Sequence, residues 1–372
     1  MKFSVEKKDL VANIQSLYNI APSKNALPIL TNYLIEANPD DNSIRFTATD
    51  LDITVIARFS LSVSEGGRLA VSAKDFTEII NSMPEAMIHC EKIEDKLHIS
   101  CGHVDFDLHC ADVEQYPLIP EANLENAIEI DARMFRKMVA NTHFAASIEA
   151  NRPIFTGIYW KLSPEYQIMA ATDGKKIADF QLNQSHPDLP ETEKIIPPKG
   201  LIFLRKTVND ENKKIQMRFE SNRVLFHYGN FTVFSHVLEG RYPEYRKAMP
   251  TENNNILTVD KSLLLDAIRR ISILSPDEPF RIKMEINATK LEISSKDRER
   301  GEAVEQIDKY EFAGEPTKIA FNYKYLQSIL NVIETDKVLF KLSNSQGPAL
   351  IYNMDLEANY EVTFLLMPLR IT

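Results

Sequence analysis

The sequence has few of the residues that signal export, disulfide bonds or phosphate-binding loops. Its 372 residues include three Cys, which argues against a disulfide framework and favours a reducing compartment. No apolar run approaches the roughly 20 residues that span a bilayer, and the first residues, MKFSVEKKDL, form no apolar signal core. We therefore expect a cytoplasmic protein with no membrane partner. With 11 Gly and no Gly-x-x-x-x-Gly-Lys-[Ser/Thr] spacing, we also expect no cofactor.

A cluster of His and Cys residues between positions 89 and 110 raises the question of a metal site. All three cysteines and four of the eight histidines lie in this range. No Cys-x-x-Cys pair of the kind that structural zinc uses is present. His109 and Cys110 are neighbours on an expected strand and so point to opposite faces. We interpret the cluster as ordinary strand residues and predict no metal.

Residues that could form a catalytic site are equally hard to assemble. There is no Gly-x-Ser-x-Gly elbow, and Cys101 has no partner base in its neighbourhood. Carboxylate pairs such as Asp50 and Asp52 are expected by chance in a chain with 53 acidic residues. We predict no catalytic residues.

What the chain does contain is an internal repeat. Six segments share a short strand, a polar pair and then apolar residues at helical spacing. They are anchored about 60 residues apart on Val5, Val71, Ile130, Ile196, Val259 and Phe321. Between them, stretches such as KLHISC, RVLFHYG and YEVTFLL alternate in the manner of antiparallel strands with one face in water. The spacing indicates a chain built from repeated strand-and-helix modules.

Pairs of these modules form three larger repeats. The first two end in similar linkers, VEQYPLIPEANLENA and LEGRYPEYRKAMPTENNN, where Tyr-Pro and a second Pro precede polar residues. We place the domains at 1–121, 122–252 and 253–372. The expected fold class is α+β, with two helices packed on antiparallel sheets in each of three pseudo-symmetric domains. The tripeptide Ala-Thr-Asp at 48–50 and 171–173 is then one turn in two copies.

Positive charge is concentrated in the helical segments. These segments, which include 132–140, 198–209 and 261–271, hold thirteen basic and four acidic residues, while the chain has a formal net charge of −10. Nothing in them resembles a helix that reads bases. One interpretation is that they are simply solvated helix faces. The other is that equivalent helices share a cationic surface, which contacts phosphates without regard to sequence.

Five short motifs carry a resemblance to a known family. They are LPIL at 27–30, ATDG at 171–174, GRYPEYR at 240–246, FN at 321–322 and MPLR at 367–370. With the three repeats and the basic helices, the whole chain resembles the bacterial sliding clamps, the beta subunits (processivity factors) of the replicative DNA polymerase III.

The resemblance implies a homodimeric ring. Three domains per chain close head to tail with a second chain around duplex DNA, and a separate ATP-dependent clamp loader opens the ring. DNA polymerase subunits and other proteins with short clamp-binding motifs are then tethered to the template. Such a tether acts by raising the effective concentration of its partners.

The resemblance also implies a partner-peptide pocket on the third domain and its junction with the second. The positions that match the family pattern are Phe155, Thr172, Gly174, Lys175, Lys176, Ile177, Pro243, Lys247, Ala248, Phe280, Asn322, Tyr325, Leu365, Leu366, Met367, Pro368, Leu369 and Arg370. The turn departs from that pattern, because Lys175 stands where His is frequent and Lys176 replaces an Arg. About half of the apolar residues in the last strand are expected to pack in the core instead.

Basic residues form the predicted DNA-binding set. Lys24 and Arg152 match basic loop positions of the family. The charge count on the helices adds Arg136, Lys137, Lys199, Arg205, Lys206, Arg269 and Arg270.

A third set is predicted for the dimer interface. The resemblance implies that Phe106 and Leu108 lie on a first-domain edge strand, opposite Ile273 and Leu274 of the other chain. Lys74, Arg298 and Arg300 complete the set. We expect ion pairs between Asp105 or Asp107 and these arginines, each worth ~0–1 kcal/mol if exposed.

Three functions compete at this stage. The first is a ring-shaped DNA tether without catalytic activity of its own. The second is a monomeric scaffold that binds proteins only, and the third is a nucleotide-processing enzyme. The basic helices favour the first, because a protein scaffold does not need them. The enzyme requires a cluster of acid, base or metal ligands that the sequence does not supply.

Overall fold

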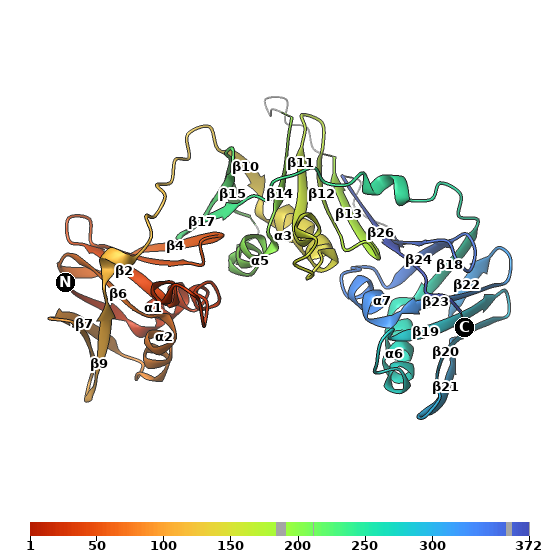
Figure 1. Cartoon of the computed structure of the whole chain (residues 1–372), viewed down its shortest axis with the longest axis horizontal. Helices are drawn as coiled ribbons and strands as arrows, with labels where there is room; N and C mark the ends of the chain where they lie inside the picture. The colour runs from red at the N-terminus through yellow and green to blue at the C-terminus, as the bar shows by residue number, and fades with distance from the viewer. Residues whose placement is uncertain (184–190, 211, 355–358, 372) are drawn as a thin grey trace. The chain divides into compact units, whose positions relative to one another are not determined.

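The computed structural model describes residues 1–183, 191–210, 212–354 and 359–371 (Figure 1). The chain forms two compact units, one of Met1–Phe135 with Lys199–Val237 and the other of Arg136–Pro198 with Leu238–Thr372. A 13-stranded sheet lies in the first unit, and a 9-stranded and a 4-stranded sheet lie in the second. Because the strand pairs within the described residues are antiparallel and helices lie beside the sheets, the expected α+β class is confirmed.

The first unit contains the whole N-terminal third of the chain and a later segment that joins its sheet. Its helices and strands are β1 (Lys2–Glu6), α1 (Lys7–Ile14), β2 (Asn32–Asn38), β3 (Ser43–Thr49), β4 (Ile53–Ser60), β5 (Ser62–Glu65), β6 (Gly67–Ser72), α2 (Ala73–Ser82), β7 (Met87–Ile93), β8 (Lys96–Cys101), β9 (Val104–Ala111), β10 (Ile128–Asp131), the start of α3 (Ala132–Thr142), α5 (Pro198–Thr207), β15 (Lys214–Phe219), β16 (Arg223–Tyr228) and β17 (Phe231–His236).

The second unit contains the rest of the middle region and the C-terminal third. Its elements are the remainder of α3, then α4 (Pro153–Thr156), β11 (Ile158–Leu162), β12 (Gln167–Thr172), β13 (Lys176–Leu182), β14 (Thr192–Ile196), β18 (Asn255–Asp260), α6 (Lys261–Ile271), β19 (Arg281–Asn287), β20 (Lys290–Asp297), β21 (Gly301–Gln306), β22 (Tyr310–Ala313), β23 (Thr317–Asn322), α7 (Tyr323–Leu330), β24 (Lys337–Leu342), β25 (Ala349–Asn353) and β26 (Tyr360–Leu366). Short 3-10 turns include Ser272–Leu274 and Tyr245–Ala248.

The six repeated modules are confirmed as strand-then-helix units. The anchor residues lie in β1, β6, β10, β14, β18 and β23, and the next element along the chain is in each case a helix. Two predicted windows were wrong by two residues at their ends: α3 continues to Thr142, and α5 stops at Thr207. Beyond the end of α5, the Asp210 backbone N–H donates to the Tyr228 hydroxyl at 3.1 Å, outside the helical hydrogen-bond pattern.

Each long helix buries one stripe of side chains at helical spacing. In α2 the buried residues include Phe76 and Ile80, and in α6 they include Leu264 and Ile268. α1 packs against α2, and α6 packs against α7 (Figure 1). Side chains cap several of these helices, as where the Asp260 carboxylate accepts from the backbone of α6. Packing of the stripe, rather than propensity alone, therefore holds these short helices in place.

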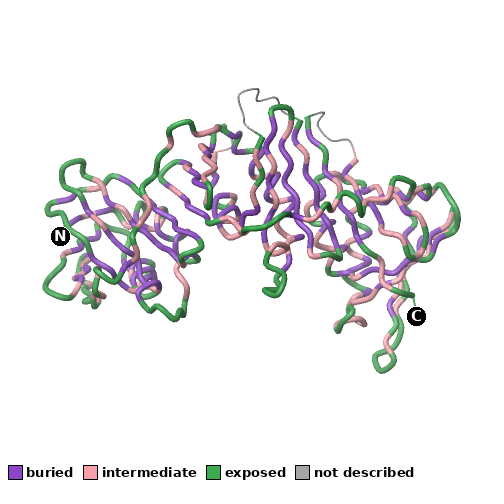
Figure 2. The backbone as a smooth tube through the Cα atoms, turned by 45° about the horizontal axis from the view of Figure 1, so that its top comes forward, coloured by how far each residue is buried: buried purple, intermediate pink, exposed green. Residues whose placement is uncertain are grey.

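The strands carry most of the buried residues, as the purple runs in Figure 2 show. Two strand pairs join segments that the sequence assigns to different domains: β4 pairs with β17, and β13 pairs with β26. Each of these pairs joins a strand before a predicted domain boundary to a strand after it. The domain boundaries at residues 121 and 252 therefore stay predictions. Among the helices of the described ranges, none has the length and apolar character needed to cross a membrane.

Candidate functional site

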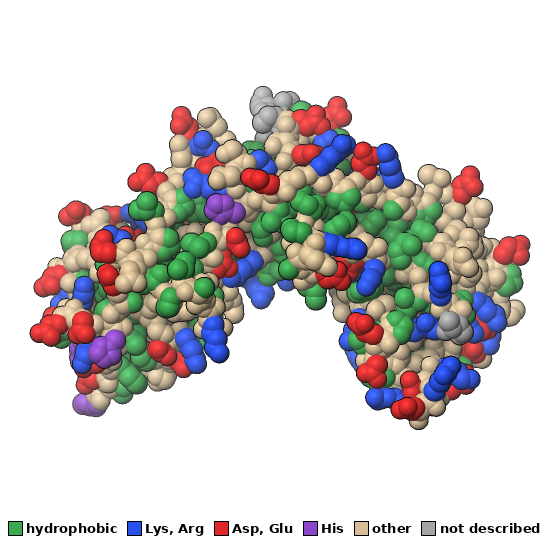
Figure 3. All heavy atoms as spheres, in the orientation of Figure 1, with side chains coloured by type: hydrophobic (Ala, Val, Ile, Leu, Met, Phe, Trp, Pro, Cys, Tyr) green, Lys and Arg blue, Asp and Glu red, His purple; other side chains and the backbone are tan. Residues whose placement is uncertain are grey.

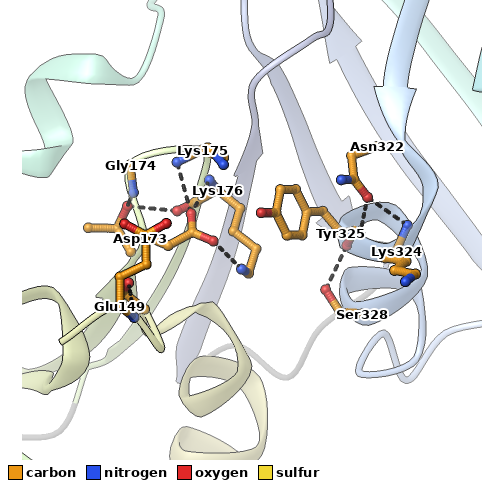
Figure 4. Close-up of polar contacts among 11 residues, drawn as sticks. Glu149, Asp173, Gly174, Lys175, Lys176, Asn322, Lys324, Tyr325 and Ser328 are labelled. Carbon is orange, nitrogen blue, oxygen red and sulfur yellow. Dashed lines mark hydrogen bonds and ion pairs between the residues drawn. The ribbon is translucent and has the colours of Figure 1, made fainter. Parts of the chain in front are cut away.

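The turn between β12 and β13 is held by hydrogen bonds from two of its own side chains. Thr172 Oγ1 donates to Lys176 O at 2.7 Å and accepts from Gly174 N at 3.0 Å. Asp173 Oδ1 accepts from Lys175 N at 2.8 Å and from Lys176 N at 2.9 Å (Figure 4). Gly174 has φ +85°, a left-handed conformation that glycine adopts without steric cost. The turn is therefore a fixed platform at one end of the sheet.

Lys176 is buried beneath this turn. Its side chain is 7% exposed, and its Nζ forms an ion pair with Asp173. The same Nζ lies 4.3 Å from the ring centroid of Tyr325 on α7, and the two side chains point toward each other in Figure 4. Burial raises the pKa of the Tyr325 phenol, and the negative charge of Asp173 raises it further. Lys176 thus links the turn to α7 by an ion pair and a cation–π contact.

The start of α7 forms a second wall of the same site. Asn322 Oδ1 accepts from Lys324 N at 2.9 Å and from Tyr325 N at 3.3 Å, which caps the helix. Lys324 Nζ lies 3.4 Å from the ring centroid of Phe280. Tyr323 N donates to Phe280 O at 2.8 Å. These contacts bring three predicted pocket residues, Phe280, Asn322 and Tyr325, to one side of the site.

The C-terminal strand β26 supplies the apolar residues. Leu365 and Leu366 are buried, in line with the expectation that about half of this stretch packs in the core. Met367 is 40% exposed, and its backbone N–H donates to Lys175 O at 2.9 Å, which holds the Met367 backbone next to the turn. Pro368, Leu369 and Arg370 line a cavity of about 600 Å³ with Ser345 and Gln346.

The linker after Tyr242 packs on the same sheet. Ile177, Leu350 and Leu365 form a buried apolar cluster, against which Tyr245 packs. Predicted residues Pro243 and Lys247 line a cavity of about 430 Å³ next to the linker, and Ala248 is exposed.

An ion-pair network that the sequence did not predict fixes this linker. Arg246 Nε and Nη2 donate to the two oxygens of Asp179 at 2.8 Å and 3.2 Å. Tyr245 donates its hydroxyl proton to Asp179 Oδ1 at 3.1 Å. The Asp179 side chain is almost fully buried, so it needs these partners. Arg246 lies within the GRYPEYR motif, which is the signal that could have located the network.

Two further predicted residues meet beside the turn. The Arg152 guanidinium lies 6.0 Å from the ring centroid of Phe155. Arg152 Nη1 is also 3.6 Å from the point that a Cβ on Gly174 would occupy. The structure therefore places Arg152, predicted for DNA, next to the turn of the predicted partner pocket.

Several of the basic residues predicted for DNA have acidic partners in the structure. Lys137 Nζ lies 3.0 Å from both Glu334 Oε2 and the Tyr360 hydroxyl, and its side chain is 16% exposed. Lys199, whose side chain is 41% exposed, pairs with Asp50 at 2.5 Å.

The C-terminal end of α6 shows the same pattern. Arg269 Nη1 lies 3.3 Å from Asp266, and Arg270 makes a two-pronged contact with Glu305 at 2.9 Å and 2.5 Å. The hydrogen bonds that Arg270 donates lower the pKa of the Glu305 carboxyl. On the face drawn in Figure 3, basic and acidic side chains are intermixed.

The other predicted DNA residues differ in exposure. Lys24, Lys206 and Arg152 are exposed, whereas Arg136 and Arg205 are half-buried.

The residues predicted for the dimer interface lie on two sheet edges and nearby turns. β9, which carries Phe106 and Leu108, pairs with β8 along residues 104–109, and β6 meets it at Cys110 and Ala111. β21 is one of the two edge strands of the 4-stranded sheet. Ile273 is 69% exposed and Leu274 is half-buried in the 3-10 turn after α6.

Charged residues of this set are also placed. Lys74 is exposed in the first turn of α2, and Arg298 is exposed after β20. Arg300 Nη2 lies 3.5 Å from Asp277. Asp105 and Asp107 lie 3.5 Å and 2.9 Å from His98 within their own chain, so any pairing across an interface competes with this histidine.

The cysteine and histidine cluster does not converge on a metal site. Within the described residues, no group of three or more His, Cys, Asp and Glu could hold a metal ion. Cys90 and Cys101 are buried, and burial raises the pKa of the Cys90 thiol, which keeps it protonated and unreactive.

Comparison with known proteins gives the same assignment along the whole chain. Residues 1–120, 129–244 and 246–370 match the models of the DNA polymerase III beta subunit N-terminal, central and C-terminal domains. The beta sliding clamp of Staphylococcus aureus (strain Mu50 / ATCC 700699) is 29% identical over 381 residues, covering 100% of this chain and 99% of the relative. That of Bacillus subtilis (strain 168) is 29% identical over 384 residues and covers 100% of both.

Solved structures agree with these relatives. The DNA polymerase sliding clamp from Bacillus subtilis has a TM-score of 0.92 at 28% identity, and the DNA polymerase III subunit beta from Pseudomonas aeruginosa has a TM-score of 0.90 at 25% identity. Each covers 100% of both chains.

Three tandem α+β domains with these likenesses define a DNA clamp. The chain belongs to the DNA polymerase III beta subunit family. It is a DNA sliding clamp, a processivity factor and not a catalytic subunit.

Proposed function

We propose that two copies of this sliding clamp close head to tail into a ring around duplex DNA. The supporting observation is a strand join that occurs twice within the chain. β4, which follows the turn at Asp50, pairs with β17, and β13, which follows the turn at Asp173, pairs with β26. In each join, the strand after an Asp turn pairs with the last strand of the next repeat.

The third and the first repeats each leave one half of one more such join, β21 and β9. β21 follows a turn in which Asp297 Oδ1 accepts from Glu299 N at 2.9 Å and from Arg300 N at 2.8 Å, as the other two aspartates do with the residues after them. β21 is an edge strand, and β9 is the last strand of the first repeat. We propose that β21 of one chain pairs with β9 of another. Such a contact joins two different surfaces, so repeated copies form either a closed ring or an open filament. In the proposed arrangement the ring closes with two chains.

The register of the internal joins extends to this interface. Val55 lies opposite Val233 in the join of β4 and β17. Within their own hairpins, Ala303 opposite Ser295 takes the place of Val55 opposite Ala48, although the third turn is one residue longer. Phe106, two residues after the hairpin turn at Val104, takes the place of Val233, two residues after Phe231. We infer that Phe106 lies opposite Ala303 of the other chain, with Leu108, Ile273 and Leu274 beside it. Lys74, Arg298 and Arg300 then form the charged rim of the interface.

We infer that the basic residues of the helices and loops contact phosphates. The proposed set is Lys24, Arg136, Lys137, Arg152, Lys199, Arg205, Lys206, Arg269 and Arg270. The acidic partners of Lys137, Lys199, Arg269 and Arg270 keep these four residues from binding tightly, which suits a clamp that must slide. Each phosphate contact releases counterions, so binding weakens as salt increases.

We also infer that the site around Asp173 and Tyr325 binds short motifs of polymerase subunits, the clamp loader and other partners. Its support is an exposed Met367 and a half-buried Phe280 beside a fixed turn and a capped helix. The protein has no catalytic activity of its own in this proposal, and it acts in the cytoplasm. The domain boundaries stay as predicted, at 121 and 252.

The ring is tested by its topology on DNA. The full-length protein is loaded with its clamp loader onto nicked circular DNA, separated from free protein, and the DNA is then linearised. A ring is retained on circles and lost from linear ends, whereas retention on both would show a groove binder and contradict the proposal. Phe106→Asp should prevent retention on circles. Ile93→Asp, an exposed residue on β7 of the same sheet, is the matched control and should behave like the wild type.

A further inference from the structure

The first unit contains a groove where β4 meets β17. It has a volume of about 340 Å³ and is formed by the turn at Asp50, the linker 117–120 and the ends of β16 and β17. Six of the residues that line it are Thr49, Leu51, Thr54, Pro117, Phe234 and His236. All of them lie within the first compact unit, so the groove belongs to that unit alone.

Strand register makes these residues equivalent to part of the proposed partner pocket. Thr49 lies opposite Thr54 just as Thr172 lies opposite Ile177. Thr54 in turn lies opposite Phe234, as Ile177 lies opposite Leu365. The repeat therefore puts a bulky apolar residue, Phe234, at the position of Leu365.

The remaining positions correspond as well. His236 is two residues beyond Phe234, as Met367 is two residues beyond Leu365. Pro117 follows Tyr116 in the first linker, as Pro243 follows Tyr242 in the second. The first linker also packs where β4 meets β17, because Ile119 contacts the apolar cluster that contains Phe234. The groove is thus a second copy of the pocket's framework.

Two exposed leucines stand at this groove. Leu51 is 47% exposed at φ +79°, and Leu118 in the linker is 100% exposed. A left-handed conformation is sterically unfavourable for leucine, and residues held in this way are concentrated at functional sites. Exposed apolar side chains around a concave site are typical of surfaces that bind another molecule.

The charge of the groove selects the kind of partner. Arg223 and His236 line it, and none of its lining residues is Asp or Glu. Arg223 lies over the ring of Phe234 at 5.3 Å, and its ion pair with Glu220 uses Nε at 2.5 Å. The Nη groups of the guanidinium are not needed for that pair and can donate to a carboxylate. An apolar floor beside these groups fits an acidic segment with a bulky apolar side chain.

We propose that this groove is a second docking site for a short extended segment of a partner protein. The apolar side chain of that segment packs on Phe234 and Leu51, and its carboxylate binds Arg223 and His236. The inference rests on the proposed function, because the groove copies the framework of the proposed partner pocket. A partner with two such segments could engage both sites of one chain, which raises its effective concentration.

The test counts binding sites on the full-length protein by calorimetry. The probe is the six-residue peptide Asp-Asp-Leu-Phe-Asp-Asp, and the control peptides carry Lys for each Asp or Ala for Leu and Phe. We expect two sites per chain for the acidic probe. Leu51→Glu and, separately, Leu118→Glu should lower the affinity of one site at least tenfold, and Met367→Glu should do so for the other. Arg223→Gln should weaken the first of these sites about fivefold.

The outcomes distinguish this inference from the proposed function. A single site lost in Met367→Glu and unchanged in Leu51→Glu and Leu118→Glu would overturn the second site and leave the partner pocket standing. A site lost in the two leucine variants but unaffected by Met367→Glu would support the groove and contradict the pocket. No binding of the probe would overturn both. Ile93→Glu, an exposed change outside the groove, should leave both sites intact, and unchanged melting curves show that each variant is folded.

Discussion

Thr49 and Thr172 begin two turns with the same hydrogen bonds. Thr49 Oγ1 donates to Ile53 O at 2.9 Å and accepts from Leu51 N at 3.1 Å, as Thr172 does with the equivalent residues of its own turn. Asp50 Oδ1 accepts from Asp52 N and Ile53 N, and Asp173 accepts from two backbone N–H groups in the same way. The Ala-Thr-Asp tripeptide thus specifies a backbone frame in both units.

The side chains around the two frames differ. The left-handed position is Leu51 in one turn and Gly174 in the other. Asp50 pairs with Lys199, which is partly in water, whereas Asp173 pairs with the buried Lys176. The repeat has therefore kept the hydrogen bonds that build the turn and changed the groups that surround it.

The largest expected difference between the turns is how much their ion pairs contribute to the free energy of unfolding. Asn keeps the oxygen that accepts the backbone hydrogen bonds but removes the charge. In Asp173→Asn the buried Lys176 loses its counter-ion, and we expect a loss of about 3 kcal/mol in the free energy of unfolding. In Asp50→Asn, Lys199 can turn to water, so the expected loss is ~0–1 kcal/mol. Urea denaturation of both variants measures the difference, and equal losses would mean that burial of the lysine is irrelevant.

The left-handed position should give a smaller effect of opposite sign in the two turns. A Cβ on Gly174 would have 3.6 Å to its nearest neighbour, so Gly174→Ala meets no clash and costs about 1 kcal/mol through φ alone. Leu51→Gly relieves the same strain and should stabilise the first turn by up to about 1 kcal/mol. Thermal melting provides the measurement. Destabilisation by Leu51→Gly would show that packing of this side chain outweighs its strain.

How far the sequence predicts these features depends on how local they are. The six modules and the repeated turn were predictable, because alternation, helical spacing and a tripeptide are written in neighbouring residues. The third turn was missed because Lys296 stands where the other two turns have Thr, so the Thr-Asp motif is absent. Asp297 nevertheless accepts the same two backbone hydrogen bonds as the other two aspartates. The network of Asp179 with Arg246 was also missed, since it depends on where the linker crosses the sheet.

The partner pocket was predicted from the resemblance to the clamp family and not from the pattern of the residues alone. Phe280, Asn322 and Met367 lie far apart in the sequence, and no local pattern predicts that they meet. The burial of Lys176 could not be predicted either, because a lysine next to a glycine turn is usually exposed. Its burial depends on Asp173 and on the ring of Tyr325 across from it.

The same ion pairs should affect DNA binding in different ways. Asp50→Asn frees Lys199 for a phosphate, which should steepen the dependence of log K on log salt by up to about 0.9. Asp173→Asn should leave that slope unchanged, because Lys176 is buried. Both slopes are measured by fluorescence anisotropy with linear duplex DNA. The salt concentration is varied between roughly 50 and 200 mM, a range over which phosphate contacts lose much of their affinity. A slope unchanged in Asp50→Asn would remove Lys199 from the DNA-binding set.

The third turn gives the smallest expected effect and tests the shared frame by pH. Hydrogen bonds from Arg300 N and Glu299 N lower the pKa of the Asp297 carboxyl below its usual value of 3.8. A lowered pKa means that the charged form stabilises the fold above pH 3.8, and that this contribution is lost as pH falls through the lower pKa of the folded state. Asp297→Asn should therefore reduce the urea midpoint at pH 7 and at pH 5 by the same amount, and the difference from wild type should shrink below pH 3.8. Both proteins are compared at one concentration, because Asp297 is near the proposed interface. A difference that grows as the pH falls would show that these two backbone bonds do not favour the charged carboxylate, and that the frame common to all three turns is held in another way.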